Sequence, residues 1–117
     1  MDGMTVLHVV RAFSAQPTLG AALPDVRIVE LPLDDALGGH LVPDLVWMSS
    51  AGPGEVLLLR RHLPRAGLLA TLPRHGDPDE VVLLLAHGAD LVLRDEGVLL
   101  AAAGLQSLAR RRAALPG

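Results

Sequence analysis

The chain has 117 residues, of which 50% are hydrophobic, and its formal net charge is −3. This composition can fill one compact core, whereas the acidic balance and the 2% aromatic content exclude a basic or ring-stacking surface for nucleic acid. All ten basic residues are arginine and there is no cysteine, which excludes lysine Schiff-base chemistry, thiolate catalysis, disulfides and cysteine zinc sites.

The apolar runs are short. The longest, residues 81–86, is far below the roughly 20 residues that a helix needs to cross a bilayer. The first four residues are acidic where a secretion signal is basic. We therefore expect a soluble, cytoplasmic protein. Residues 1–117 form one predicted domain, and residues 109–117 would suit a linker if the natural chain continues.

Short β-rich runs alternate with longer helical patterns along the whole chain. Strands that are apolar at nearly every position must be covered on both faces, and strand–helix alternation supplies that cover. The pattern predicts a flavodoxin-like (βα)5 fold, α/β and doubly wound, with a parallel five-stranded sheet in the order 2-1-3-4-5. In chain order the predicted elements are strand 5–10, helix 17–23, strand 26–31, helix 33–41, strand 45–48, helix 55–63, strand 68–72, helix 78–87, strand 91–93 and helix 97–114.

The charged groups at the helix ends have a structural explanation. Asp77, Pro78 and Glu80 match the preferences of a helix N-cap, the first helical position and a capping box, so the neighbouring His75 does not indicate a metal site. Three consecutive arginines at 110–112 suit the partial negative charge at the end of the last helix.

The residues at the carboxyl ends of the predicted strands are the candidates for a site, because ligands of open α/β sheets bind there. Pro43-Asp44 enters the third strand, which ends at Ser49, and Pro53-Gly54 follows. Thr71 ends the fourth strand, and Gly88-Ala89-Asp90 leads into the fifth. This ordered set resembles the receiver domain of bacterial two-component response regulators, over essentially the whole chain. The resemblance places Ser49 at the phosphoacceptor aspartate and Thr71 at the Thr/Ser switch position.

The departures from the family pattern concern its chemistry. The acidic pair that holds Mg²⁺ is replaced by Arg11 and Ala12, and Val92 stands at the aromatic switch position. Asp95 aligns with the phosphate-binding lysine, or Arg94 does if the alignment slips by one residue. Phosphoryl transfer needs a metal and cations that neutralise the transferred group. The chain therefore resembles a degenerate receiver, or pseudo-receiver.

We accordingly expect a regulatory domain that is not an enzyme, takes no phosphoryl group and needs no metal or cofactor. It would act in signal transduction or transcriptional regulation through contacts with a second copy, another regulatory protein or an output domain, and not with nucleic acid or a membrane. The last helix is apolar beyond a single stripe, which would suit either a partner or close packing on the sheet. The predicted interaction face, implied by the resemblance, contains Leu91, Val98, Leu105 and Leu108.

Other classes of function have weaker support. The alternative is a sensing domain in which Arg11 binds an anionic small molecule in the remodelled pocket. A hydrolase would use Ser49 with His75, but no G-x-S-x-G pattern surrounds Ser49. A nucleotide fold lacks G-x-G-x-x-G, and the five histidines show no i, i+4 pair that would indicate a metal. His8, inside the first strand, is predicted to be a satisfied core imidazole.

Overall fold

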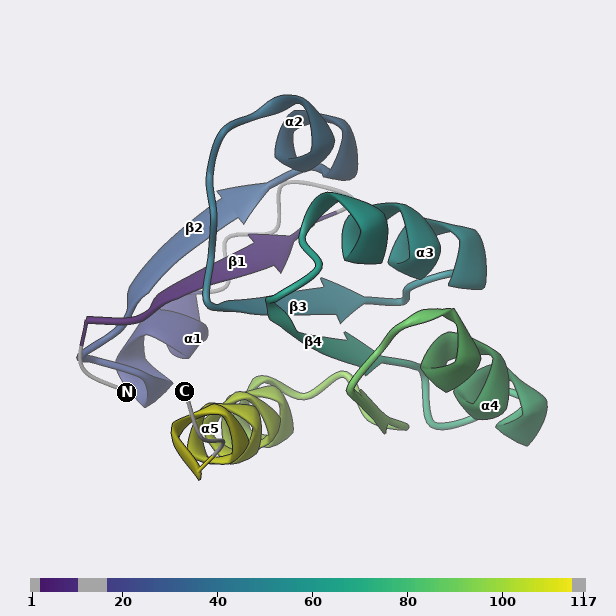
Figure 1. The fold of residues 1–117 in the computed structure, drawn as a ribbon. Helices are drawn as coiled ribbons and strands as arrows, with labels where there is room; N and C mark the ends of the chain where they lie inside the picture. Colours follow the sequence, from purple (N-terminus) through teal and green to yellow (C-terminus); the bar gives the residue numbers. More distant parts are fainter. Residues whose placement is uncertain (1–2, 11–16, 115–117) are drawn as a thin grey trace.

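The computed structural model describes residues 3–10 and 17–114, without the side chains of residues 17, 18, 113 and 114. Strands and helices alternate along the chain, as predicted (Figure 1). The elements are β1 Thr5–Val9, α1 Pro17–Ala22, β2 Arg27–Leu31, α2 Leu33–Gly38, β3 Leu45–Ser49, α3 Pro53–His62, β4 Gly67–Thr71, α4 Pro78–His87, β5 Leu91–Leu93 and α5 Val98–Ala114.

The five strands form one parallel sheet in the order β2-β1-β3-β4-β5, which confirms the predicted flavodoxin-like fold. The two strands that carry the candidate site are in register, because Trp47 lies opposite Leu69 and Ser49 opposite Thr71. Every residue of β4 is buried, and so is every residue of β3 except Ser49. These strands therefore need apolar side chains on both faces, which explains their unbroken apolar sequences.

Helices cover both faces of the sheet. Helices α1 and α5 lie on one face and α2, α3 and α4 on the other (Figure 1). Because side chains alternate along a strand, Val46 and Met48 enter the core under α2–α4, whereas Leu45 and Trp47 enter the core under α1 and α5. Trp47 is only 2% exposed, in agreement with the prediction that it lies buried on the third strand.

Helix α4 has the predicted bounds, and its cap explains why. The side chain of Asp77 accepts a hydrogen bond from the backbone N–H of Asp79 at 2.9 Å, and Pro78 occupies the first helical position. The side chain of Glu80 adds no reciprocal bond among the described contacts, so the cap is the Asp77 half of the predicted box. The helix ends at Gly88, whose φ of 125° strongly favours glycine.

The other four helices differ from the predicted bounds, α1 and α5 by one residue and α2 and α3 by more. Helix α3 begins at Pro53, two residues early, because the Glu55 carboxylate accepts the backbone N–H of Gly52 at 3.0 Å and so closes the first turn. Helix α2 ends at Gly38, three residues early, where Gly39 turns into extended backbone. Among the described residues, no helix combines the length and the apolar character that crossing a membrane requires.

Candidate functional site

The carboxyl ends of β3, β4 and β5 bring the candidate residues to one edge of the sheet. Ser49 ends β3, Thr71 ends β4, and the charged run from Arg94 to Glu96 follows β5 directly. Arg11 and Ala12, which the sequence placed at the same edge, lie outside the described residues. The described part of the site therefore consists of hydroxyl groups and the loop between β5 and α5.

Glu96 forms the central contact of this edge. Its Oε1 accepts a hydrogen bond from the Ser49 hydroxyl at 3.3 Å and a shorter one from the Ser50 hydroxyl. Successive side chains of a strand point to opposite faces, but Ser50 has a φ of 52°, in the left-handed region. This conformation costs a non-glycine residue about 1–2 kcal/mol. It lets two consecutive hydroxyls reach the same carboxylate oxygen.

Neither Arg94 nor Asp95 contacts the hydroxyl of Ser49 in the described structure. Asp95 binds Arg74 instead, with its Oδ2 at 2.6 Å from Nε and 2.5 Å from Nη2. Arg94 Nη2 donates to the carbonyl of Gly76 at 2.6 Å. The described side chain after β5 that contacts the Ser49 hydroxyl is that of Glu96.

Asp95 holds its charge through the loop itself. A backbone hydrogen bond from Gly97, at 2.7 Å, and the guanidinium of Arg74 lower the pKa of Asp95 below its usual value. The loop from β5 to α5 therefore presents two carboxylates, those of Asp95 and Glu96. Of the two, Asp95 is paired with an arginine, Arg74. Sequence reasoning missed Glu96 because three consecutive charged residues follow β5, and only the loop conformation decides which one turns toward Ser49.

Thr71 is fully buried and its hydroxyl is engaged in the core. Its Oγ1 accepts a hydrogen bond from the indole Nε1 of Trp47 at 3.0 Å. Trp47 also contacts His8, whose ring stacks on the indole with centroids 4.1 Å apart and planes 6° apart. The threonine at the predicted switch position thus belongs to a packed unit that reaches across three strands.

His8 departs in part from its prediction. It is buried, as expected, but its Nδ1 has no hydrogen-bond partner, because the nearest carboxylate oxygen, Glu30 Oε1, is 3.7 Å away. Burial lowers the pKa of His8, against the opposing effect of Glu30. The imidazole is therefore held neutral at pH 7, and it is only partly satisfied.

The described groups that contact Ser49 and Ser50 at this edge come down to one carboxylate, that of Glu96. Ser49 is paired with Glu96, and no contact joins it to His75 in the described structure. Among the described residues, no group of three or more histidines and acids is arranged to hold a metal ion. The geometry shows a hydroxyl that donates to a carboxylate, without the histidine partner of the hydrolase hypothesis among the described contacts of Ser49.

The predicted interaction face needs correction at two positions. Leu105 and Leu108 are 0% and 4% exposed, because they lie on the side of α5 that packs against the sheet. Leu91 and Val98 are partly buried. The apolar side chains that α4 and α5 do expose are Val82, Leu83, Leu85, Leu99 and Leu100, which we call the α4–α5 apolar group.

The structure is similar to solved receiver domains. The orphan response regulator HP1043 of H. pylori matches with a TM-score of 0.74 at 16% identity, over 91% of this chain and 96% of its own. The BeF3-activated DrrB receiver domain matches with a TM-score of 0.77 at 14% identity, over 95% of this chain and 100% of its own. The beryllofluoride-activated NtrC4 receiver domain dimer matches with a TM-score of 0.67 at 17% identity, over 89% and 98%.

Searches by sequence find no matching family model and no matching curated protein. The structural likeness confirms the receiver-domain fold that the motifs predicted.

Proposed function

We propose that this chain, which has the receiver-domain fold, is a regulatory module that works without phosphorylation and acts through protein contacts. The observation that carries the proposal is the Glu96 carboxylate beside the hydroxyls of Ser49 and Ser50. In this fold the phosphoacceptor position holds a serine, and the group next to it is an anion.

The charges around Ser49 oppose phosphoryl transfer. A transferred phosphoryl group spreads negative charge over its oxygens and needs a metal and cations to neutralise it. The chain has no lysine, and the sequence places Arg11 and Ala12 where metal-binding acids would be required. Glu96 would add its own negative charge to that of the phosphoryl group, because its carboxylate lies within hydrogen-bond distance of the Ser49 hydroxyl. Repulsion between Glu96 and the phosphoryl group would raise the barrier to transfer. Nucleophile, metal and cation act as a unit, so the absence of any one of them impairs the contribution of the others.

The same charges argue against the alternative, in which the remodelled pocket binds an anionic effector. The described side chains at this edge include two carboxylates, and one of the two arginines, Arg74, is paired with Asp95. The other, Arg94, is directed to backbone carbonyls. An incoming anion would meet the charge of Glu96, which forms no ion pair with a described residue.

Protein contact is the remaining mode of action, and the α4–α5 apolar group supports it. Leu99 is 78% exposed and Val82 is 64% exposed, so covering them with a partner would remove apolar surface from water and favour binding. The structure of the similar NtrC4 receiver domain is that of a dimer. We propose that the group contacts a second copy of this chain or another regulatory protein.

The test is intact-mass spectrometry after incubation with acetyl phosphate and Mg²⁺. We expect no phosphate adduct on the wild type, and none on Ser49→Asp. In that variant the new carboxylate would lie beside Glu96, and repulsion would raise the pKa of one or both groups. A stoichiometric adduct on the wild type would overturn the proposal. An adduct on Ser49→Asp alone would show that the pocket still neutralises a phosphoryl group.

A further inference from the structure

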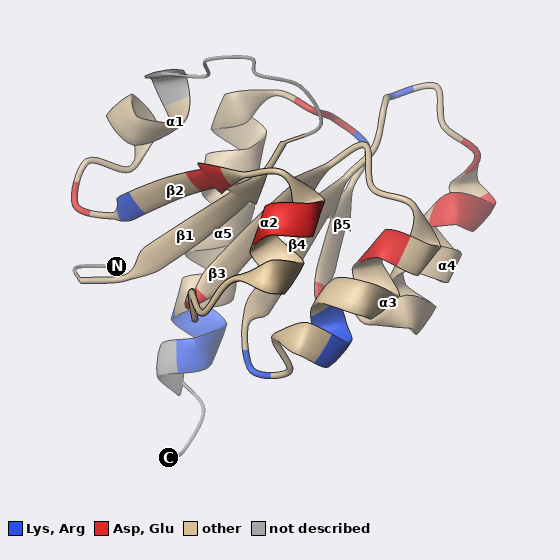
Figure 2. Cartoon of the chain, turned by 90° about the horizontal axis from the view of Figure 1, so that it is seen from above, with Lys and Arg blue, Asp and Glu red and all other residues tan. Residues whose placement is uncertain are grey.

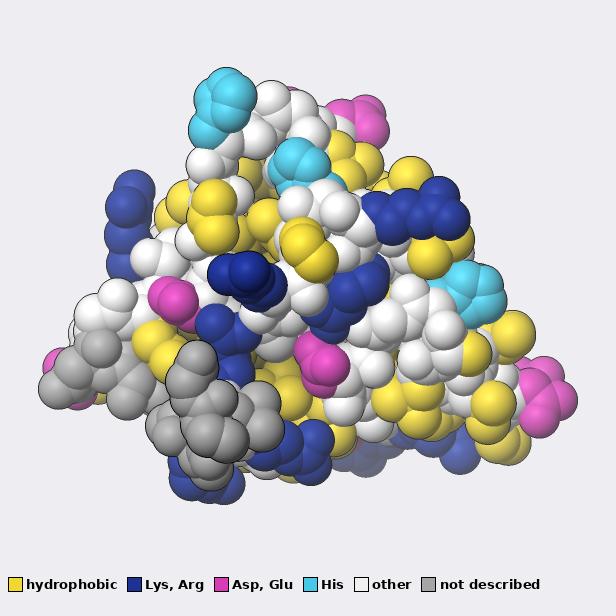
Figure 3. Space-filling view, viewed as in Figure 1, with side chains coloured by type: hydrophobic (Ala, Val, Ile, Leu, Met, Phe, Trp, Pro, Cys, Tyr) yellow, Lys and Arg dark blue, Asp and Glu magenta, His cyan; other side chains and the backbone are white. Residues whose placement is uncertain are grey.

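The opposite edge of the sheet, at the amino ends of the strands, is rich in arginine. All five helices run back toward this edge, so the last turns of α3 and α5 meet near the loop that joins α3 to β4 (Figure 2). Figure 3 shows arginine side chains gathered over this loop, with apolar and histidine side chains beside them. Much of the positive charge of an acidic protein is thus concentrated at one end.

Two adjoining cavities open at this edge, with volumes of about 400 and about 290 Å³. Four residues line both cavities, so the two share a wall, and we call them together the amino-edge groove. The shared residues are Pro64, Arg65, Ala66 and Arg112. A combined space of this size falls in the range of small-molecule sites.

The acids near the groove are already engaged in the fold. Asp44 accepts the backbone N–H of Thr5 at 2.9 Å. Asp90 accepts Arg60 at 2.7 Å and the backbone N–H of Leu68 at 2.8 Å. Among the described residues, by contrast, Arg65 and Arg111 form no ion pair. The groove therefore carries guanidinium charge that no described carboxylate neutralises.

Helix ends explain only some of these arginines. Arg111 and Arg112 lie in the last turn of α5, where cations are favourable in any protein. Arg65 lies in the loop after α3, and its backbone carbonyl accepts a hydrogen bond from Arg112. This bond joins the α3–β4 loop to the end of α5 and so places the two cationic segments on one wall. Because Arg65 lies outside a helix end, interaction with a helix dipole does not explain its position. Binding of a ligand in the groove would explain it.

Apart from its arginines and the two acids Asp44 and Asp90, the groove has a largely apolar lining. Val42, Pro43, Leu63 and Pro64 line the larger cavity together with His62. Val42 is 81% exposed, which leaves an apolar surface next to the guanidinium groups. A ligand that matches both features carries a phosphate at one end and an uncharged, largely apolar body at the other.

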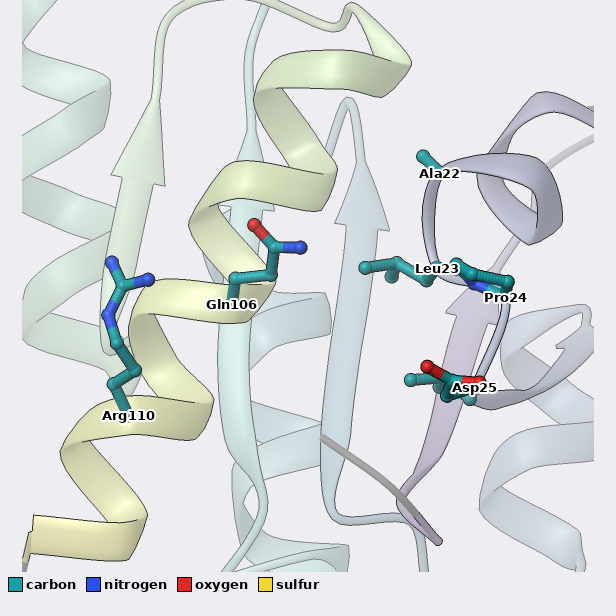
Figure 4. A pocket seen from close by; sticks show the side chains of 7 residues that line it. Ala22, Leu23, Pro24, Asp25, Gln106 and Arg110 are labelled. Atoms are coloured by element: carbon teal, nitrogen blue, oxygen red, sulfur yellow. The ribbon is translucent and has the colours of Figure 1, made fainter.

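A third cavity has a different charge balance in its lining. It lies between the α1–β2 corner and α5, has a volume of about 370 Å³ and is lined by Asp25 as well as Arg110 (Figure 4). In Figure 4, Arg110 extends along α5 and away from Asp25. One acid and one base leave this cavity without net charge, so it has no preference for an anion.

We propose that the amino-edge groove binds a phosphorylated small molecule of nucleotide size, such as a nucleoside diphosphate. Arg65 and Arg111 bind the phosphates, because a planar guanidinium matches phosphate oxygens in a bidentate manner. The apolar wall around Val42 contacts the base. This site is distinct from the carboxyl edge and does not depend on how that edge works.

The experiment is isothermal titration calorimetry of the full chain with ADP, pyrophosphate and adenosine at low and at physiological salt. We expect ADP to bind more tightly than pyrophosphate, adenosine not to bind, and ADP affinity to fall as salt rises. Arg65→Gln and Arg111→Gln should each weaken ADP binding about tenfold, the loss expected for one charge-assisted bond. Arg110→Gln is the matched control, since it removes the same charge from the same helix but lines the other cavity.

Several outcomes would overturn the proposal. Absence of ADP binding at millimolar concentration would do so, as would equal weakening by Arg110→Gln, which would indicate attraction to net charge alone. Equal affinity for pyrophosphate and ADP would show that the apolar wall contributes nothing. None of these results bears on phosphoryl transfer to Ser49, which is measured separately by mass.

Discussion

At the scale of single residues, His8, Trp47 and Thr71 form a unit that connects three strands. The imidazole stacks on the indole, and the indole donates to the threonine hydroxyl. All three are nearly inaccessible to solvent. Stacking of this kind contributes about 0.5–1.5 kcal/mol beyond area burial. The hydroxyl at the predicted switch position is therefore tied to the state of the core rather than free at the pocket.

The lowered pKa of His8 predicts a pH dependence of stability. In the unfolded chain His8 has the ordinary histidine pKa of 6.5, and in this fold its pKa is lower. The unfolded chain therefore binds the proton more readily. Its contribution to stability is complete above pH 6.5 and is lost as the pH falls through 6.5 toward the lower folded pKa. We expect urea denaturation, followed by Trp47 fluorescence, to show lower stability at pH 5.5 than at pH 7.5.

Two variants separate His8 from the other titrating groups. His8→Phe keeps a ring against Trp47 and should reduce the loss of stability between pH 7.5 and 5.5. His62→Gln, at an exposed position, should leave that loss unchanged. An unaltered pH dependence in His8→Phe would contradict the assignment of the effect to His8.

At the scale of elements, Arg60 joins the end of α3 to two loops. Its guanidinium donates to the carbonyls of Gly88 and Ala66, each at 2.8 Å, and to Asp90 at 2.7 Å. Asp90 in turn accepts the backbone N–H of Leu68, the second residue of β4. The Gly-Ala-Asp stretch before β5 is thus a structural landmark, because its glycine and its aspartate both bind Arg60.

Loss of this junction should destabilise the fold. We expect Arg60→Ala to cost about 1–3 kcal/mol, because it leaves two carbonyls without this donor and removes a partly exposed ion pair with Asp90. Gly88→Ala should cost more than about 1 kcal/mol, since φ is 125° and a Cβ would lie 2.7 Å from Arg60 Cγ. The measurement is the midpoint of urea denaturation.

Arg61→Ala is the matched control for Arg60. Arg61 is the next residue of the same helix and is exposed, without a hydrogen bond or ion pair among the described contacts. We expect a change within about 0.5 kcal/mol, as for an ordinary surface substitution. Equal losses in both variants would show that the arginines act through the charge of the helix end alone.

At the scale of the whole molecule, we propose different partners for the α4–α5 apolar group and for the arginine edge. We expect sedimentation velocity to show concentration-dependent self-association that Leu99→Glu and Leu100→Glu abolish, because a charge cannot be buried unpaired at an interface. Leu58→Glu is the control, since Leu58 on α3 and Leu100 are similarly exposed, at 50% and 49%. Dissociation by Leu58→Glu alone would place the interface on α3.

The sequence predicted the architecture because its signals are local. Runs that are apolar on both faces predict covered parallel strands, and the Asp77-Pro78 pair and Gly88 predict the two ends of α4. The order of the strands was confirmed, and so was the burial of Trp47. The same signals were weaker in α5, where Leu and Ala occur around the helix. The side that packs on the sheet cannot be assigned from such a pattern, which is why Leu105 and Leu108 were wrongly included in an exposed face.

By itself, then, the sequence determined the strand order and the absence of any lysine, and its resemblance to receivers predicted a serine at the phosphoacceptor position. Only the tertiary structure decided that Glu96, rather than Arg94 or Asp95, lies beside Ser49, which is 47 residues away in the chain. It also decided that Arg65 and Arg112 line one groove from two distant segments. The reason is that strand and helix signals depend on neighbouring residues. The direction of one side chain in a charged loop depends on backbone turns, such as that at Ser50, which are set by contacts between distant elements.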